Sequence, residues 1–403
     1  MIHYFNPGHE TAVLMASEHY QPAAGILQIH NDLAYLPAWY ASPDDYVLTE
    51  NSVPDDFLAP AELLKPRAKP VIINDFIKNS DIFKNQEVSI WGISPQSIRY
   101  FEKLNSQYGL QLSVPRWKPE YYELTSRQVS QKILSRLIED IPEIERDIIP
   151  RFYSSVKEIE DRISQSDEKM LIKSPYSSSG RGLIWLPPHK MAQSERQILS
   201  GMLKRQGHVS LEKVLYKRLD FSMHFENIAD CRMQFIGYSV FTTTAKGAYE
   251  KSILASQKKL EAQITSLVDK SLLIRVKDNL TELLHEKYSP YYKGNIGIDM
   301  MIYRSNGRNK LHPCVEINMR KSMGYLAIQL FNNYIHPDFH GEFFVKYYSN
   351  PQTLLKERED LQKQYPPVIE KNLIKNGYLN LCPITETTRY HAFILPALGS
   401  SAL

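Results

Sequence analysis

KSPYSSSGRG, residues 173–182, is the stretch of this chain that says most about its fold. A strand-like run, residues 170–173, leads into it, and a second apolar run, residues 183–186, follows it. The pattern therefore predicts two short strands joined as a hairpin. Backbone N–H groups around glycines, with serine hydroxyls beside them, form a concave site for phosphate, and Lys173 would add a positive charge. A Ser/Gly loop is more often only a hairpin tip, so the phosphate interpretation depends on the sequence downstream.

A second hairpin is predicted over residues 297–320. The Asn306-Gly307 pair between two apolar runs is a strong signal for a hairpin turn. If the strands pair symmetrically about positions 307 and 308, Asp299 lies opposite or diagonal to Glu316. Both carboxylates would then share one face of the hairpin, close enough to hold one cation.

The side chains that follow Glu316 extend this polar face. The strand period of two adds Asn318 and Arg320 to it, and turns residues 315, 317 and 319 toward the core. Two carboxylates and an amide oxygen are hard ligands of the kind that Mg²⁺ takes, and neighbouring carboxylates repel unless a cation neutralises them. A solvent-facing polar stripe on an amphipathic strand explains the same pattern. Arg320 is then either a solvated basic end or a clamp for an anion.

The composition excludes several classes of protein. A chain of 403 residues exceeds what one hydrophobic core normally covers, so two or three domains are expected. The net charge of +3, from 48 basic and 45 acidic residues, does not favour a nucleic-acid partner. Cys231, Cys314 and Cys382 lie far apart and fit neither a disulfide framework nor a zinc site. With no signal peptide or membrane-spanning run, we expect a cytoplasmic protein without a membrane partner.

Four segments follow from the alternation of strand and helix patterns. Residues 1–118 predict a small open α/β domain, and residues 119–208 predict helices around the Lys173 hairpin. Residues 209–345 are rich in strands, with one helical stretch at 258–285, and residues 346–403 form a tail of unknown role. Helix starts and ends are indicated by capping patterns at residues 95–109, 125–128, 155–158 and 194–197.

Between the two hairpins lies a possible site for a base and a sugar. The strand that contains Glu212-Lys213-Val214-Leu215 would present backbone groups to a flat heterocycle, and Asp220 would accept a hydrogen bond from a ribose hydroxyl. An ordinary β-strand explains these residues equally well.

Taken in order, these elements resemble the ATP-grasp superfamily. Its pattern is a strand lysine, a Ser/Gly phosphate loop, an adenine hinge, a ribose acid and a metal hairpin. The chain has these at Lys173, 177–182, 212–215, Asp220 and 299–320. The resemblance covers roughly residues 120–330, and the α/β start corresponds to the family's N-terminal, pre-ATP-grasp domain. We therefore expect an α/β protein with an ATP-grasp fold built from α+β lobes.

The resemblance also implies the role of each residue in binding ATP. Lys173 would contact the α- and β-phosphates, and the loop would cover the β- and γ-phosphates. The hinge backbone would bind adenine, and the acid would bind ribose. The implied ATP-binding residues are Lys173, Ser178, Ser179, Gly180, Glu212, Lys213, Leu215 and Asp220.

The implied chemistry is that of a ligase. Asp299, Glu316 and Asn318 would bind Mg²⁺, and Arg320, together with Lys173, would stabilise the transferred phosphoryl group. A substrate carboxylate would attack ATP, and an amine or similar nucleophile would capture the acyl phosphate. A phosphotransferase, or a regulatory protein that binds nucleotide without turnover, are the alternatives. The sequence leaves open which small molecule or peptide carries the carboxylate, and whether the chain forms a homo-oligomer.

Several other positions stay open. Met319 and Lys321 replace the small or proline residues that the family often has there, and Lys246 and Arg232 are candidates for a further basic residue near the γ-phosphate. Residues 6–10, after the first strand, either line the acceptor site or form a plain βα turn. His336 and His340 are interpreted as loop histidines rather than metal ligands.

Overall fold

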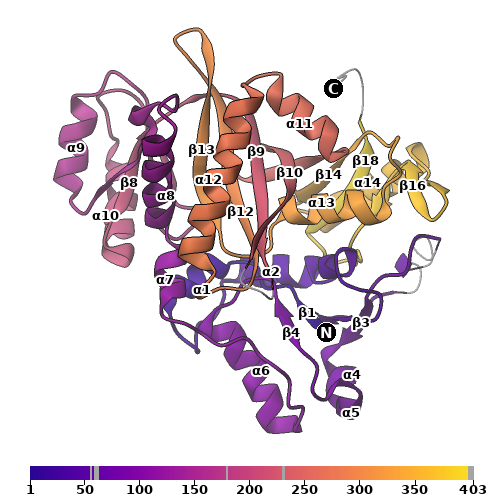
Figure 1. The fold of residues 1–403 in the computed structure, drawn as a ribbon. Coiled ribbons are helices and arrows are strands. Elements are labelled where there is room, and N and C mark those ends of the chain that lie inside the picture. The colour runs from indigo at the N-terminus through magenta and orange to yellow at the C-terminus, as the bar shows by residue number, and fades with distance from the viewer. Residues whose placement is uncertain (55–56, 59–62, 178–179, 229–231, 398–403) are drawn as a thin grey trace. The chain divides into compact units, whose positions relative to one another are not determined.

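The computed structural model describes residues 1–54, 57–58, 63–177, 180–228 and 232–397 (Figure 1). Contacts divide the chain into two compact units. The terminal unit consists of Met1–Lys118, Glu250–Leu260 and Arg320–Leu403, and the central unit consists of Pro119–Tyr249 and Glu261–Met319. Each unit is described on its own.

The terminal unit begins with an open parallel sheet in the order β3-β2-β1-β4. Its strands are β1 (Ile2–Tyr4), β2 (Tyr46–Thr49), β3 (Lys69–Ile72) and β4 (Val88–Ile90). This confirms the open α/β architecture predicted for the start of the chain. The strand order reverses between β1 and β4, so the loops after these two strands flank the place where open α/β sheets bind ligands.

Helices of this unit pack on the parallel sheet. The longest, α6 (Pro95–Tyr108), begins at Ser94, which forms a reciprocal capping box with Ser97, and ends at Gly109 with φ +63°. The predicted bounds, Pro95 to Gly109, are confirmed with Gly109 as the C-cap, and the serine capping box is a finding of the structure. The others are α1 (His9–Met15), α2 (Ala24–Leu33), the short 3-10 helix Leu36–Trp39, α4 (Ile73–Lys78) and α5 (Ser80–Phe83).

The C-terminal tail belongs to the terminal unit. Its antiparallel strands have the order β11-β14-β18-β17, at Tyr249–Leu254, Gly341–Tyr347, Tyr390–Pro396 and Leu379–Asn380. The indole N–H of Trp39 donates to Leu381 O at 2.8 Å, and the Asp32 carboxylate accepts from the backbone N–H groups of Arg389 and Tyr390. The part of the tail around residues 381–390 is therefore held by the N-terminal segment. The remaining elements here are α13 (Met323–Tyr334), α14 (Pro351–Gln364), β15 (Val368–Glu370) and β16 (Leu373–Asn376).

In the central unit, the Lys173 hairpin lies in a four-stranded antiparallel sheet of order β5-β8-β6-β7. The strands are β5 (Arg151–Tyr153), β8 (Val209–Lys213), β6 (Met170–Lys173) and β7 (Leu183–Leu186), and Lys173 pairs with Leu183 as the predicted hairpin requires. Apolar side chains of α9 (Val156–Ser164) and α10 (Gln193–Gln206) pack with this sheet. The predicted α10 start at Ser194 is wrong: the helix begins after Ala192, whose N–H is bound by the Glu195 carboxylate.

The second sheet of the central unit has the order β13-β12-β9-β10. These strands are β9 (Tyr216–Asn227), β10 (Met233–Thr243), β12 (Gly294–Ser305) and β13 (Arg308–Asn318). Alternate residues of β9 and β12, among them Phe221, Met223 and Ile298, are fully buried, which leaves the opposite face to polar side chains. The single helical stretch expected at 258–285 is two helices, α11 (Gln257–Thr265) and α12 (Lys270–Tyr288), because Asp269 caps a new start.

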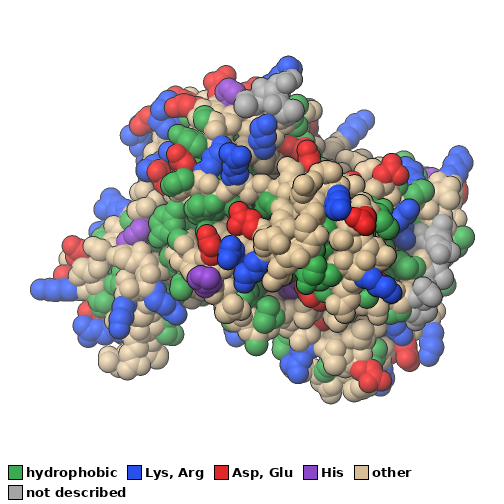
Figure 2. All heavy atoms as spheres, turned by 90° about the horizontal axis from the view of Figure 1, so that it is seen from below, with side chains coloured by type: hydrophobic (Ala, Val, Ile, Leu, Met, Phe, Trp, Pro, Cys, Tyr) green, Lys and Arg blue, Asp and Glu red, His purple; other side chains and the backbone are tan. Residues whose placement is uncertain are grey.

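The central unit also has two helices before β5. They are α7 (Glu120–Thr125) and α8 (Arg127–Asp140), and the 3-10 turn Arg146–Ile148 follows them. No helix in the described residues is both long enough and apolar enough to cross a bilayer. On the face shown in Figure 2, basic side chains are scattered among acidic and apolar ones.

Candidate active site

Lys173 and Glu212 form a nearly buried ion pair between neighbouring strands β6 and β8. The Lys173 Nζ lies 2.5 Å from Glu212 Oε2, and the Ser210 hydroxyl donates to Glu212 Oε1 at 3.0 Å. Burial would raise the pKa of the Glu212 carboxyl, but Lys173, followed by Arg127 and His312, outweighs it and holds that pKa below its usual value. The lysine charge is thus fixed where β6 ends and the Ser/Gly loop begins.

The loop after Lys173 is anchored at both of its described ends. The Ser174 N–H donates to Gly182 O at 2.9 Å, and Gln206 binds both backbone groups of Tyr176. Gly180 has φ +72°, and a Cβ added there would lie 2.6 Å from Lys246 O, so the loop packs directly on the turn between β10 and β11. The predicted phosphate ligands Ser178 and Ser179 lie outside the described residues.

Asp299 and Glu316 lie directly opposite each other in the hairpin of β12 and β13. The turn itself is not centred where the sequence analysis expected. Ser305 pairs with Arg308, so Asn306 and Gly307 form the turn, with φ +49° and +76° as the tight type I′ turn requires.

A register shift restores the predicted carboxylate pair. Continued without interruption from this turn, the pairing of Ser305 with Arg308 would set Asp299 opposite Cys314. The ladder instead shifts between Asp299 and Met301, and beyond the shift Asp299 faces Glu316. Such an irregularity re-aims side chains at functional positions in many sheets.

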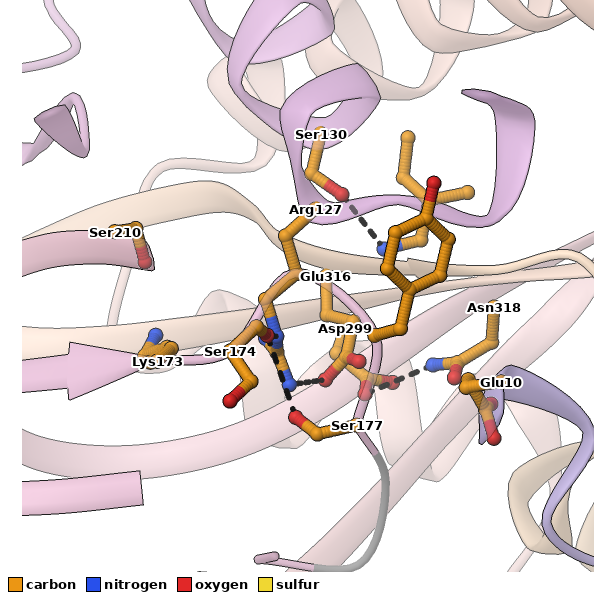
Figure 3. Close-up of polar contacts among 12 residues, drawn as sticks. Glu10, Arg127, Ser130, Lys173, Ser174, Ser177, Ser210, Asp299, Glu316 and Asn318 are labelled. Atoms are coloured by element: carbon orange, nitrogen blue, oxygen red, sulfur yellow. Dashed lines mark hydrogen bonds and ion pairs between the residues drawn. The ribbon is translucent and has the colours of Figure 1, made fainter. Parts of the chain in front are cut away.

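The donor set of this hairpin fits a divalent cation. Asn318 donates its amide N–H to Asp299 Oδ2 at 3.1 Å, which leaves its amide oxygen as the ligand atom beside two carboxylates (Figure 3). Within the described parts of the chain, no three His, Cys, Asp or Glu side chains gather as a metal site. The protein would thus supply few ligands, as Mg²⁺ sites completed by water and substrate phosphates do.

Arg127, which the sequence analysis did not assign to the site, binds Glu316. Its Nη2 lies 2.8 Å from Glu316 Oε2, its Nε donates to Ser174 O at 3.1 Å, and its backbone N–H donates to Pro175 O at 3.1 Å (Figure 3). Arg127 therefore joins the Ser/Gly loop to the carboxylate hairpin. In the sequence analysis, Arg127 is included only in the capping pattern 125–128, which takes Thr125 as the cap; the cap is Ser126, so Arg127 is the first residue of α8.

The helix that carries Arg127 is fixed against the hairpin one turn later. The Ser130 hydroxyl accepts from the backbone N–H of Ile317 at 3.0 Å, and Cys314 Sγ donates to Ser130 O at 3.6 Å. Positions 127 and 130 share one face of α8. The bond between Ser130 and Ile317 therefore fixes the position of Arg127 along β13, beside Glu316. The N-cap of α8 is Ser126, whose hydroxyl accepts from Gln128 N–H.

A small pocket, with room for about one water molecule, adjoins these charges. His312 contributes to its wall, and burial, together with Lys173, lowers the pKa of that imidazole to about 4. The wall is therefore uncharged at His312 at neutral pH. The lining residues are Arg127, Ser130, Gln131, Pro150, Phe152, Ser210, Glu212, His312, Cys314 and Val315.

The predicted adenine residues lie at the end of β8 and directly after it. Strand β5 pairs with β8 only as far as Leu211, so the backbone from Glu212 onward continues beyond that partner. Lys213 lies exposed, 3.4 Å from Asp147. Leu215 O accepts from the Lys217 N–H, and Val214 N–H donates to Lys169 O. The structure thus gives the positions of Glu212, Lys213 and Leu215, and their adenine role stays a prediction.

Asp220, on β9, is nearly buried and already bound. Lys217 Nζ lies 2.5 Å from its Oδ2, and the Thr243 hydroxyl donates to the same oxygen at 3.3 Å. Burial raises the pKa of this carboxyl against the opposing effect of Lys217. Its assignment to ribose stays a prediction.

Arg320 belongs to the terminal unit, where it binds Glu10. Its Nε lies 2.5 Å from Glu10 Oε1; burial would raise the pKa of Glu10, but Arg320 outweighs it and holds that pKa at about 2. Beside this pair, Asn6 exchanges two hydrogen bonds with the backbone of Gly92, so the loops after β1 and β4 are tied together. The acceptor-site interpretation of residues 6–10 remains open.

The remaining candidates lie at the surface. Lys246 and Arg232 are exposed. His336 Nδ1 lies 3.6 Å from Asp338, and His340 Nε2 lies 2.9 Å from Lys259 Nζ. A cation beside His340 disfavours metal binding there.

The comparisons with known proteins concern the fold. No family model matches the sequence, and no curated protein matches it. Among solved structures, biotin carboxylase from Campylobacter jejuni is similar, with a TM-score of 0.52 at 10% identity over 98% of this chain and 87% of that chain. N5-carboxyaminoimidazole synthetase from Staphylococcus aureus has a TM-score of 0.48 at 11% identity over 99% of this chain and 93% of that chain.

Both similar structures are ATP-grasp enzymes, and the first likeness is the one on which the conclusion rests. It extends over nearly the whole chain and includes the open α/β start as well as the two sheets of the central unit. The chain has the ATP-grasp fold.

Proposed function

We propose that this protein is an ATP- and Mg²⁺-dependent ligase. It would activate a substrate carboxylate as an acyl phosphate, which an amine or similar nucleophile then attacks. The observation that carries this proposal is the pairing of Asp299 with Glu316 on the hairpin, joined through Arg127 to the loop that follows Lys173. The similar biotin carboxylase was solved as a β-γ-ATP complex, which supports a nucleotide site in this fold.

Nucleotide binding is assigned to the central unit. Lys173 and Arg127 supply positive charge for the phosphates, and the loop through Ser178, Ser179 and Gly180 supplies backbone donors. The backbone of Glu212 and Leu215, with Lys213 nearby, binds adenine, and Asp220 binds ribose. Lys217 would move away from the Asp220 oxygen that the ribose hydroxyl takes.

Metal binding and phosphoryl transfer use the hairpin. Asp299, Glu316 and the Asn318 amide oxygen would hold Mg²⁺, which supplies charge that neutralises the phosphates when it is bound. Arg320 is assigned to the transferred phosphoryl group. Phosphoryl transfer requires alignment and charge neutralisation rather than covalent help from the protein, and these residues offer both. The loop would also keep water from an acyl phosphate.

Substitution of Glu316 tests this proposal. Glu316→Ala should lower Mg²⁺-dependent release of ADP from ATP by at least about a hundredfold, because it removes a ligand of the metal that neutralises the phosphates. Glu139→Ala, at an exposed acid of α8, serves as the matched control. Glu139→Ala should unfold close to the wild-type temperature, whereas Glu316→Ala should unfold at a lower temperature because Arg127 loses its partner, so turnover is compared at a temperature where thermal unfolding shows both variants to be folded. Turnover that survives in Glu316→Ala would refute the site assignment.

A phosphotransferase is the second candidate, because the same residues would transfer phosphate without a later nucleophile. A stable phosphorylated product that accumulates when no amine is supplied would favour it. A screen of amino acids, dipeptides and hydroxy acids for acceptor-stimulated ADP release separates these outcomes. Tight ATP binding without ADP release from any acceptor would instead favour a regulatory, nucleotide-binding protein.

A further inference from the structure

The central unit has two nearly buried cations, Lys173 and Arg127, and each pairs with a different carboxylate. Lys173 binds Glu212, which is not among the proposed metal ligands. Arg127 binds Glu316, which is, and their side chains are only 10% and 20% exposed. A divalent cation that takes Glu316 Oε2 as a ligand therefore meets the positive charge of Arg127 Nη2 at that oxygen.

We propose that Arg127 gates the metal site: it competes with the divalent cation for Glu316, and nucleotide phosphates release this competition by taking over the guanidinium. The inference rests on the proposed function and adds a coupling between the binding of metal and the binding of nucleotide. Metal alone would bind weakly, and metal and nucleotide would bind cooperatively.

The geometry makes Arg127 suited to this exchange. Its Nε is held by Ser174 O and its backbone N–H by Pro175 O, while α8 is fixed to β13 through Ser130. The guanidinium is thus tethered at the mouth of the phosphate loop, and only its Nη2 needs to change partner. The planar guanidinium has five N–H donors. It can bind first a carboxylate and then a phosphate while the aliphatic part of the side chain moves little.

The charges make the competition strong. A guanidinium within hydrogen-bond distance of a carboxylate repels a divalent cation at the same oxygen, and burial keeps water from screening this repulsion. Phosphates reverse it, because they bind the guanidinium and bring negative charge to the metal. The nucleotide would therefore raise metal affinity by more than its own chelation of the metal.

The test measures Mn²⁺ binding without nucleotide, by electron paramagnetic resonance of the free ion. Arg127→Gln should bind Mn²⁺ at least about tenfold more tightly than the wild type, because the competing charge is gone. The same variant should bind metal-free ADP, measured by calorimetry in EDTA, about tenfold more weakly. A merely structural arginine would not move these two affinities in opposite directions.

Two further variants sharpen the measurement. Arg136→Gln removes an exposed arginine of the same helix, paired only loosely with Glu139, and should change neither affinity. Glu316→Gln should bind metal-free ADP more tightly than the wild type, because Arg127 no longer divides itself between carboxylate and phosphate. This second result decides the matter if Arg127→Gln fails to fold.

Mn²⁺ affinity that is unchanged or weaker in folded Arg127→Gln overturns the gate, as does unchanged ADP affinity in Glu316→Gln. If the wild type still releases ADP from ATP with Mg²⁺ in that case, only this inference is lost. If the wild type binds neither Mn²⁺ nor ADP, the proposed function is lost with it.

Discussion

Lys173 illustrates how a single buried charge is made tolerable in this chain. Its side chain is 9% exposed, and that of Glu212 is 16% exposed, so each depends on the other to offset the loss of water. A lysine at the end of a strand was visible in the sequence, and Glu212 was singled out only for its backbone. The pairing of Lys173 with Ser210 and of Leu171 with Glu212 in the sheet brings the two side chains together.

At the residue scale, we expect a strong non-additivity between these two positions. Lys173→Met should lower the free energy of unfolding by about 3–5 kcal/mol, because it leaves the Glu212 carboxylate buried and unpaired. Lys173→Met combined with Glu212→Gln should recover most of that loss. Urea unfolding of the two single variants and the double variant measures the coupling. Additive losses would show that the two charges do not depend on each other.

The element that most needs tertiary contact is the Ser/Gly loop. Gly180 touches the turn at Lys246–Gly247 through backbone atoms, and Gly247 itself has φ +82°. Two glycines at one contact let the two segments approach more closely than side chains would permit. The sequence shows each glycine, but not that they meet.

At the element scale, Gly180→Ala should weaken ATP binding. The loss should exceed that of a glycine-to-alanine change at another positive-φ position that has no close contact. The added Cβ would lie 2.6 Å from Lys246 O, which pushes the loop off the turn. Gly207→Ala is the matched control, because Gly207 has φ +78° but nothing within 4 Å of its Cβ position. Both variants should lose about 1 kcal/mol of stability from the backbone strain. Equal nucleotide affinity in the two would argue against a role for the contact.

The whole molecule contains an unusual number of buried, uncharged histidines. Burial lowers the pKa of His3, His9, His224 and His312 to about 4, and that of His391 to about 3, from an ordinary 6.5. The unfolded chain therefore binds more protons than the folded chain in the interval between these values. These groups contribute stability that is fully present above pH 6.5 and is lost as pH falls toward 4.

At the scale of the molecule, the free energy of unfolding should fall steeply from pH 6.5 to about 5, where carboxylates still contribute little. Each histidine adds up to about 1.4 kcal/mol per pH unit to the slope. Urea unfolding at several pH values measures it. His391→Gln keeps a partner for the Tyr378 hydroxyl. It should reduce the slope of the free energy of unfolding against pH by the contribution of one histidine. A flat profile over this range would contradict the burial of these imidazoles in neutral form.

The sequence by itself determined those elements whose signals lie in neighbouring residues. The Asn306-Gly307 turn, the end of α6 at Gly109 and the Lys173 hairpin were predicted because each depends on residues that are neighbours in the chain. The same signals failed by two residues at α10, where the Glu195 carboxylate accepts from the N–H of the N-cap residue Ala192 and no serine caps the helix.

Only the tertiary structure decided which residues meet. The register shift that sets Asp299 opposite Glu316, the Arg127 bridge from loop to hairpin, and the return of β18 beside β14 all join positions far apart in sequence. Local patterns carry no information about such contacts, because their free energy comes from burial and charge pairing that exist only after the sheets have assembled.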